Sequence, residues 1–129
     1  MPGAGSKAGE GATVEQVLSL ERLAEIRSSP RFKGTGGPEV PLPDGTTVSR
    51  DTIFEAIKPL VARGPGACPD LVRALRSHET HVRYGAYLAL KLITRSEKAY
   101  YPFFSPEDPK NLDAFREWES FVEQGGCEK

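Results

Sequence analysis

Long apolar runs are missing from this sequence, and no signal peptide is expected within its first residues. No apolar stretch approaches the roughly 20 residues that a membrane-spanning helix requires. The first twelve residues, MPGAGSKAGEGA, lack the apolar core of a signal peptide. We therefore expect no membrane span. The compartment stays open between the cytoplasm and export after removal of a signal peptide.

Basic charge is not in excess either. The 17 lysines and arginines face 18 acidic residues, which gives a formal net charge of −1 and a pI of about 6.1. Because proteins that bind nucleic acids usually carry a clear basic excess, the composition disfavours a nucleic-acid partner. One small basic cluster with an aromatic residue would instead favour binding of single-stranded nucleic acid. It consists of Arg27, Arg31, Phe32 and Lys33.

Catalytic signatures are scarce as well. The chain contains no GxSxG, no phosphate-binding P-loop and no GxGxxG after a strand, so we expect neither catalysis nor a cofactor. Its two cysteines, Cys68 and Cys127, have no CxxC spacing. Two alternatives remain for them, one disulfide or two free thiols. Cys68 lies near an expected helix start, a position that can activate a thiol, but a buried structural role is favoured.

What the sequence does contain is helical periodicity, which begins at residue 13. Residues 1–12 are mostly Gly, Ala, Ser and charged residues and are predicted to be disordered. Residues 13–124 are expected to form a single helical domain, and residues 125–129 a flexible tail. The predicted fold class is all-α, with about five helices over residues 13–27, 51–63, 69–75, 81–94 and 111–124.

Local signals set the ends of these helices. Thr13 with Gln16 fits a capping box at the start of the first helix. Pro59 should kink or divide the second helix because it removes a backbone donor. Asn111 is a good N-cap for the last helix.

Residues 28–50 are irregular and rich in glycine and proline. The Pro43-Asp44-Gly45 turn favours one small hairpin over residues 38–48. An extended loop is the alternative, since Pro41 and Pro43 cannot donate ladder hydrogen bonds.

The helix expected at residues 81–94 has two apolar stripes. The first is unbroken and includes small residues that let a neighbouring helix approach closely: Val82, Gly85, Ala86, Ala89, Leu90 and Ile93. The second consists of Tyr84, Leu88 and Leu92, four residues apart. A helix with two apolar sides needs two neighbours, which favours stacked helix pairs.

Residues 64–94, GPGACPDLVRALRSHETHVRYGAYLALKLIT, resemble a HEAT repeat of the HEAT-like, PBS-lyase type. The matching motif positions are Gly64-Pro65, Pro69, Leu71, Leu75, Val82-Arg83, Ala86 and Ala89-Leu90. The next segment, AYYPFFSPEDPKNLDAFREWESFVEQ, is similar to the closing segment of bacterial HEAT repeat domain-containing proteins. There a Tyr-Pro stretch and a Trp-bearing helix follow the final repeat.

This resemblance implies a short stack of antiparallel helix pairs, a fragment of an α-solenoid. The clearest repeat would be residues 64–94, with a capping segment at 99–124. The implied function is a non-catalytic protein-binding or scaffolding module with a protein partner. In the turn, where the family commonly has aspartates, this chain has Ser77 and Glu79, so no aspartate-to-arginine ladder is expected.

The outward side of the helix at 81–94 is the candidate binding surface, because HEAT proteins often bind through this helix of the pair. Its residues are Arg83, Tyr84, Tyr87 and Lys91. Tyrosine and arginine are frequent anchors of protein interfaces. Trp118 is expected to pack against Tyr100, Tyr101 or Phe103 and to cap the stack.

The turn at His78, Glu79 and His81 supports an alternative interpretation, a metal-dependent enzyme. Histidine and carboxylate are suitable ligand types. The spacing, however, is not the HExxH pattern that places two histidines on one helix face, and a solvated turn between helices is favoured. A second alternative is nucleic-acid binding through a HEAT-like surface, as in HEAT-like DNA-repair glycosylases, which require a strongly basic concave face.

Overall fold

The computed structural model describes residues 13–30, 36–96 and 98–128. It is mainly helical with one small two-stranded sheet, which confirms the mainly helical class. The elements are α3 Val14–Val17, α4 Leu20–Ser28, β1 Glu39–Pro41, β2 Thr47–Ser49, α5 Arg50–Ala56, α6 Lys58–Arg63, η1 Gly64–Ala67, α7 Cys68–Ala74, α8 Thr80–Thr94, α9 Pro109–Glu123 and η2 Gly126–Glu128. The segment 1–12, predicted to be disordered, lies outside the described residues, as do Arg31, Phe32 and Lys33.

Within the described part of the chain, the helices are all too short or too polar to cross a membrane.

The expected first helix is present but divided into two. The Thr13 capping box is confirmed, since Thr13 N–H donates to Gln16 Oε1 (2.9 Å) and Gln16 N–H donates to Thr13 Oγ1 (3.1 Å). The prediction of one helix over residues 13–27 is wrong, because α3 ends after one turn. Ser19 then caps α4, with its hydroxyl accepting from Arg22 N–H at 3.2 Å.

Residues 39–49 form a hairpin, which decides between the two alternatives left by the sequence. The strands β1 and β2 are antiparallel, with Val40 opposite Val48, and both valines are buried in the core. Asp44 stabilises the turn by accepting from the backbone N–H of Thr46 at 3.0 Å. Arg27 of the basic cluster donates to the Thr47 carbonyl at 3.2 Å and so joins α4 to this hairpin.

Pro59 divides the expected second helix, as predicted. The helix α5 ends at Ala56, and α6 begins at Lys58 with the proline in its first turn. The Ile57 side chain at the junction is fully buried, so the break directs an apolar residue into the core.

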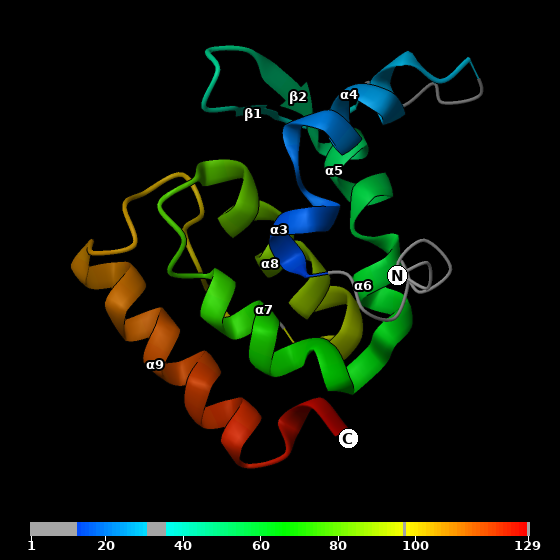
Figure 1. Ribbon diagram of the computed structural model, residues 1–129. Coiled ribbons are helices and arrows are strands. Elements are labelled where there is room, and N and C mark those ends of the chain that lie inside the picture. Colours follow the sequence, from blue (N-terminus) through cyan, green and yellow to red (C-terminus); the bar gives the residue numbers. More distant parts are fainter. Residues whose placement is uncertain (1–12, 31–35, 97, 129) are drawn as a thin grey trace.

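Helix α8 lies at the centre of the fold (Figure 1) and contacts α3, α5, α6 and α7. Its small residues permit this, as predicted. A Cβ added at Gly85 would lie 2.6 Å from Leu18 Cδ1 and 3.3 Å from Ile57 Cγ2. The second stripe is covered incompletely, since Leu88 is buried but Leu92 is 37% exposed. The neighbours of α8 therefore cover Leu88 but leave Leu92 partly in solvent.

Gly85→Ala is expected to lower the free energy of unfolding by about 1–3 kcal/mol, because an added methyl group overpacks a close contact. Urea denaturation followed by circular dichroism measures the change. Gly66→Ala is the matched control, since its Cβ would meet nothing within 4 Å. Equal denaturation midpoints for the two variants would contradict the close approach at Gly85.

Helix α9 starts before the predicted position. Asp108 is the N-cap, with its side chain accepting from Lys110 N–H at 2.9 Å, and Pro109 occupies the first turn. The prediction that Asn111 caps this helix is wrong, because Asn111 lies within the first turn of α9, where it is buried at 1% exposure.

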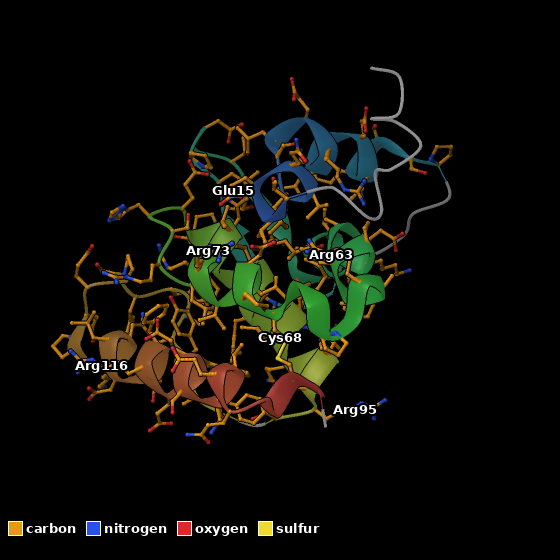
Figure 2. All side chains as sticks on the ribbon, turned by 60° about the horizontal axis from the view of Figure 1, so that its bottom comes forward. Glu15, Arg63, Cys68, Arg73, Arg95 and Arg116 are labelled. Atoms are coloured by element: carbon orange, nitrogen blue, oxygen red, sulfur yellow. A yellow bond between two sulfur atoms is a disulfide. The ribbon has the colours of Figure 1, made fainter. Side chains whose placement is uncertain are left out.

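The C-terminal segment is held against the helices by a disulfide. Cys68, at the start of α7, is bonded to Cys127 in η2, with their Cα atoms 6.6 Å apart (Figure 2). The sequence left this pairing open. Residues 125–129 were expected to form a flexible tail, but Cys127 is buried and covalently attached to the core.

Candidate functional site

The segment between α8 and α9 presents aromatic side chains to solvent. Tyr101, Phe103 and Phe104 are 40%, 48% and 44% exposed. With Pro102 they form the aromatic loop, residues 101–104. Clustered exposed aromatic residues commonly mark a contact surface.

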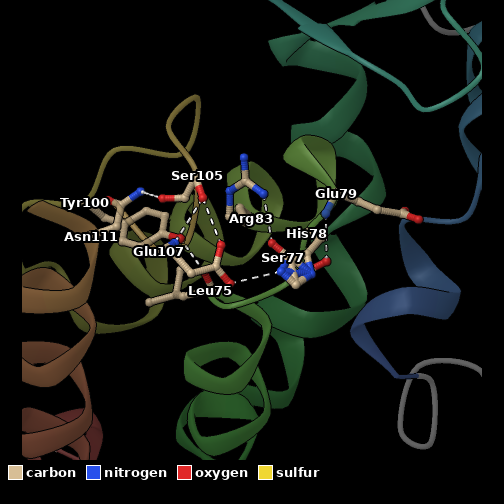
Figure 3. Close-up of polar contacts among 9 residues, drawn as sticks. All are labelled: Leu75, Ser77, His78, Glu79, Arg83, Tyr100, Ser105, Glu107 and Asn111. Carbon is tan, nitrogen blue, oxygen red and sulfur yellow. Dashed lines mark hydrogen bonds and ion pairs between the residues drawn. The ribbon is translucent and has the colours of Figure 1, made fainter. Parts of the chain in front are cut away.

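Asn111 holds the aromatic loop from the α9 side. Its Oδ1 accepts from Tyr101 N–H at 2.9 Å. Its Nδ2 donates to the carbonyl oxygens of Tyr101 (2.8 Å) and Ser105 (3.0 Å), and Figure 3 shows it beside Ser105. A buried amide with its donors and acceptor satisfied fixes the backbone on both sides of the exposed rings.

Arg83 holds the same loop from the α8 side. Its guanidinium donates to the carbonyls of Pro102 (Nε, 3.1 Å) and Ser77 (Nη1, 2.8 Å) and to Thr80 Oγ1 (Nη2, 3.3 Å). The residue is only 3% exposed. Burial lowers the pKa of Arg83, while Tyr100 and Glu107 raise it. The expectation that Arg83 stands outward beside Tyr87 and Lys91 is therefore wrong, because its guanidinium is directed to the partly buried carbonyls of Ser77 and Pro102.

The other three predicted binding residues lie on α8, next to the segment between α8 and α9. Tyr84 is half-buried, and its ring lies 5.5 Å from that of Phe103. Tyr87 and Lys91 are neighbours, as predicted, with Lys91 Nζ 5.2 Å from the Tyr87 ring centroid. Tyr87 also donates its hydroxyl to the Lys98 carbonyl at 3.0 Å. Tyr84 and Tyr87 therefore support the segment that carries the aromatic loop.

Buried aromatic rings continue from this segment towards the C-terminus. Trp118 is fully buried, and its ring lies 6.4 Å from Tyr87 and 5.8 Å from Phe121. Tyr87 in turn lies 5.6 Å from Tyr100. The ring contacts of Trp118 with described residues are therefore with Tyr87 and Phe121, and not with the predicted partners Tyr100, Tyr101 or Phe103.

Tyr100 ties the segment to the end of α7. Its hydroxyl donates to the Leu75 carbonyl, and the side chain is buried. Burial raises the pKa of Tyr100 to about 12, although the nearby charge of Arg83 opposes this shift. The phenol therefore stays protonated and keeps its hydrogen bond at neutral pH.

The three residues of the metal alternative point to different surroundings. His78 Nε2 lies 3.0 Å from Glu107 Oε2, and Figure 3 shows Glu79 directed away from this pair. His81 points into the core at 2% exposure, with Nε2 3.7 Å from Glu79 Oε1. Over residues 13–30, 36–96 and 98–128, no three His, Cys, Asp or Glu side chains are placed to share a metal ion.

The buried imidazole of His81 should make stability depend on pH. Burial lowers the pKa of His81 below 6.5, against the attraction of Glu79 and a hydrogen bond to the Leu18 backbone. On acidification the His81 imidazole is protonated more readily in the unfolded chain than in the folded chain. The free energy of unfolding is therefore highest above pH 6.5 and decreases as the pH falls below that value. We expect a smaller loss of the thermal midpoint between pH 7.5 and 5 in His81→Gln than in wild type. Parallel pH profiles for the two proteins would contradict this role.

A shallow cleft of about 230 Å³ lies between the aromatic loop and α9. Its lining residues are Ala99, Tyr101, Lys110, Asp113, Ala114 and Glu117. The aromatic loop and this cleft were not among the predicted site residues. The signal was present in the sequence as YYPFF, residues 100–104, in which four of five residues are aromatic.

Comparisons of the chain with protein-family models, with curated proteins and with solved structures find no match in any of the three.

Proposed function

We propose that this chain is a non-catalytic protein-binding module of the HEAT-repeat type, and that the aromatic loop, residues 101–104, is its contact surface. The observation that carries the proposal is the combination of exposed rings with a fixed backbone. Three aromatic side chains are 40–48% exposed, while Asn111 and Arg83 bind the loop carbonyls from opposite sides.

Physical reasons favour protein binding over a merely structural role. Leaving large apolar surface in water is unfavourable, at roughly 25 cal/mol per Å², and a partner that covers the rings would recover this energy. A loop that is already ordered also loses little conformational entropy on binding. Aromatic residues are, in addition, enriched among the side chains that dominate binding energy.

The packing of α7 on α8 supports the repeat interpretation. These helices are joined by a short turn and contact each other, and α8 carries the small residues that the HEAT-like motif places there. In this proposal, residues 64–94 are one helix pair of a stack, and α9 with the aromatic loop closes its end. The binding surface then lies on the closing segment, adjacent to Tyr84.

Comparing retained proteins tests the proposal. Wild type, a Phe103→Ser/Phe104→Ser variant and the control Leu92→Ser are immobilised and exposed to lysate of the native cells. Leu92 is also an exposed large apolar residue, but it lies about two turns beyond Tyr84 along α8. We expect at least one protein to be retained by wild type and control and lost from the loop variant.

The retained protein, once purified, should bind the loop variant at least tenfold more weakly than wild type. Equal affinity for all three proteins, with equal thermal midpoints, would rule out the aromatic loop as the contact surface.

A further inference from the structure

The cleft beside the aromatic loop combines an aromatic wall with carboxylates. Tyr101 lines it on the loop side, and Lys110, Asp113 and Glu117 line it on α9. The small residues Ala99 and Ala114 complete the lining. Asp113 and Glu117 are four residues apart and therefore lie on the same face of the helix. The arrangement offers one flat apolar surface and two anionic groups to a single side chain.

A cation of the chain already lies over these rings. Tyr101 and Phe104 are stacked, with centroids 5.7 Å apart and an interplanar angle of 18°. Lys110 Nζ lies 5.8 Å from the Tyr101 centroid and 5.9 Å from the Phe104 centroid. These distances are at the outer end of the cation–π range, about 6 Å, so a better-placed cation can replace the lysine.

The carboxylates of the cleft are available to such a cation. Asp113 is 79% exposed, and its ion pair with Arg116 has a long 3.6 Å separation between exposed groups, an arrangement that contributes little stability. The surrounding segment, residues 106–129, contains seven acidic and three basic side chains. Its field therefore attracts positively charged segments.

We propose that this cleft binds an arginine side chain from an exposed basic segment of the partner protein. This inference rests on the proposed function and gives the partner its chemistry. A guanidinium suits the cleft better than an ammonium, because its plane stacks on Tyr101 while its N–H groups donate to Asp113 and Glu117. Tyr101 thus joins the cleft to the aromatic loop, and the same partner would cover both.

NMR titration of the full-length, ¹⁵N-labelled protein tests this proposal. The probes are three peptides with a common Gly-Ser backbone that carry arginine, lysine or glutamate at the same positions. We expect the arginine peptide to shift the amides of Tyr101, Asp113 and Glu117. It should bind at least fivefold more tightly than the lysine peptide, and the glutamate peptide should cause no shift.

Charge-matched variants separate the cleft from the general acidity of α9. Asp113→Asn with Glu117→Gln should weaken binding of the arginine peptide about tenfold. Glu119→Gln with Glu123→Gln removes the same charge from exposed positions of α9 outside the cleft lining and should change the affinity less than twofold. Lys110→Ala should strengthen binding, because it removes the competing cation.

Equal weakening by both double variants would overturn the proposal, as would equal affinity for the arginine and lysine peptides. Concentration-dependent self-association that the Asp113→Asn/Glu117→Gln variant abolishes would also overturn it, in favour of a second copy of this chain.

The proposed function is tested separately. If the arginine peptide does not bind, but the Phe103→Ser/Phe104→Ser variant still does not retain the protein that wild type retains, the aromatic loop remains the proposed contact surface. The proposal of a basic partner segment is then excluded.

Discussion

Replacing both cysteines, Cys68→Ala with Cys127→Ala, is expected to lower the free energy of unfolding by about 4 kcal/mol. The bond joins residues 59 apart in sequence, and closing a loop of that length restricts the unfolded chain by about 4 kcal/mol. Because domains of this size are stable by only about 5–15 kcal/mol, the loss is a large part of the total. Denaturant unfolding followed by circular dichroism measures it.

Reductant provides the matched control for this prediction. Wild type should shift towards the midpoint of the double variant when dithiothreitol is added, whereas the double variant should not respond. A wild-type midpoint that is the same with and without reductant would show that the bond between Cys68 and Cys127 contributes no stability.

Trp118→Ala is expected to lower the free energy of unfolding by about 3–5 kcal/mol, the usual range for truncation of a large core aromatic residue. The side chain is fully buried and packs edge-on against Tyr87 and Phe121. Its removal would leave a cavity between α8 and α9. Urea denaturation measures the loss.

Two further variants make this prediction specific. Trp118→Phe should be milder, because it keeps an aromatic ring and removes a buried Nε1 that has no hydrogen-bond partner within the described residues. Glu119→Ala, at the exposed neighbouring position, should change stability by less than about 0.5 kcal/mol. An unchanged midpoint in Trp118→Ala would contradict the capping role of α9.

The features predicted correctly from the sequence depend on neighbouring residues. The capping box of Thr13 and Gln16 and the division at Pro59 involve groups within a few residues of each other, so local chemistry is sufficient to predict them. The close approach at Gly85 also followed from its place in an apolar stripe. By contrast, the break at Ser19 was missed because the apolar spacing continues across it.

The errors involve residues whose roles depend on distant backbone. Arg83 has the periodicity of an outward position, yet its Nε donates to Pro102, 19 residues later. Asn111 has the chemistry of a helix cap, but it binds the carbonyl of Tyr101, 10 residues earlier. Helical spacing cannot predict either contact, because both require the loop between α8 and α9 to fold back onto the helices.

The exposure of the aromatic loop was not predicted for the same reason. The resemblance to HEAT repeats directed attention to α8, where Tyr84 and Tyr87 are half-buried under the C-terminal segment. The exposed rings lie instead at residues 101, 103 and 104. Their sequence indicates apolar character but not that the folded loop would leave them in water.

We expect Asn111 to hold the aromatic loop in one conformation, with its rings exposed to a partner. Backbone ¹⁵N order parameters for residues 101, 103, 104 and 105 test this most directly, in wild type and in Asn111→Ala. We expect values near 0.85 in wild type, typical of rigid backbone, and values below about 0.6 in the variant, with the order parameters of the other residues unchanged. Values below about 0.6 in wild type, or equal values in the two proteins, would contradict it.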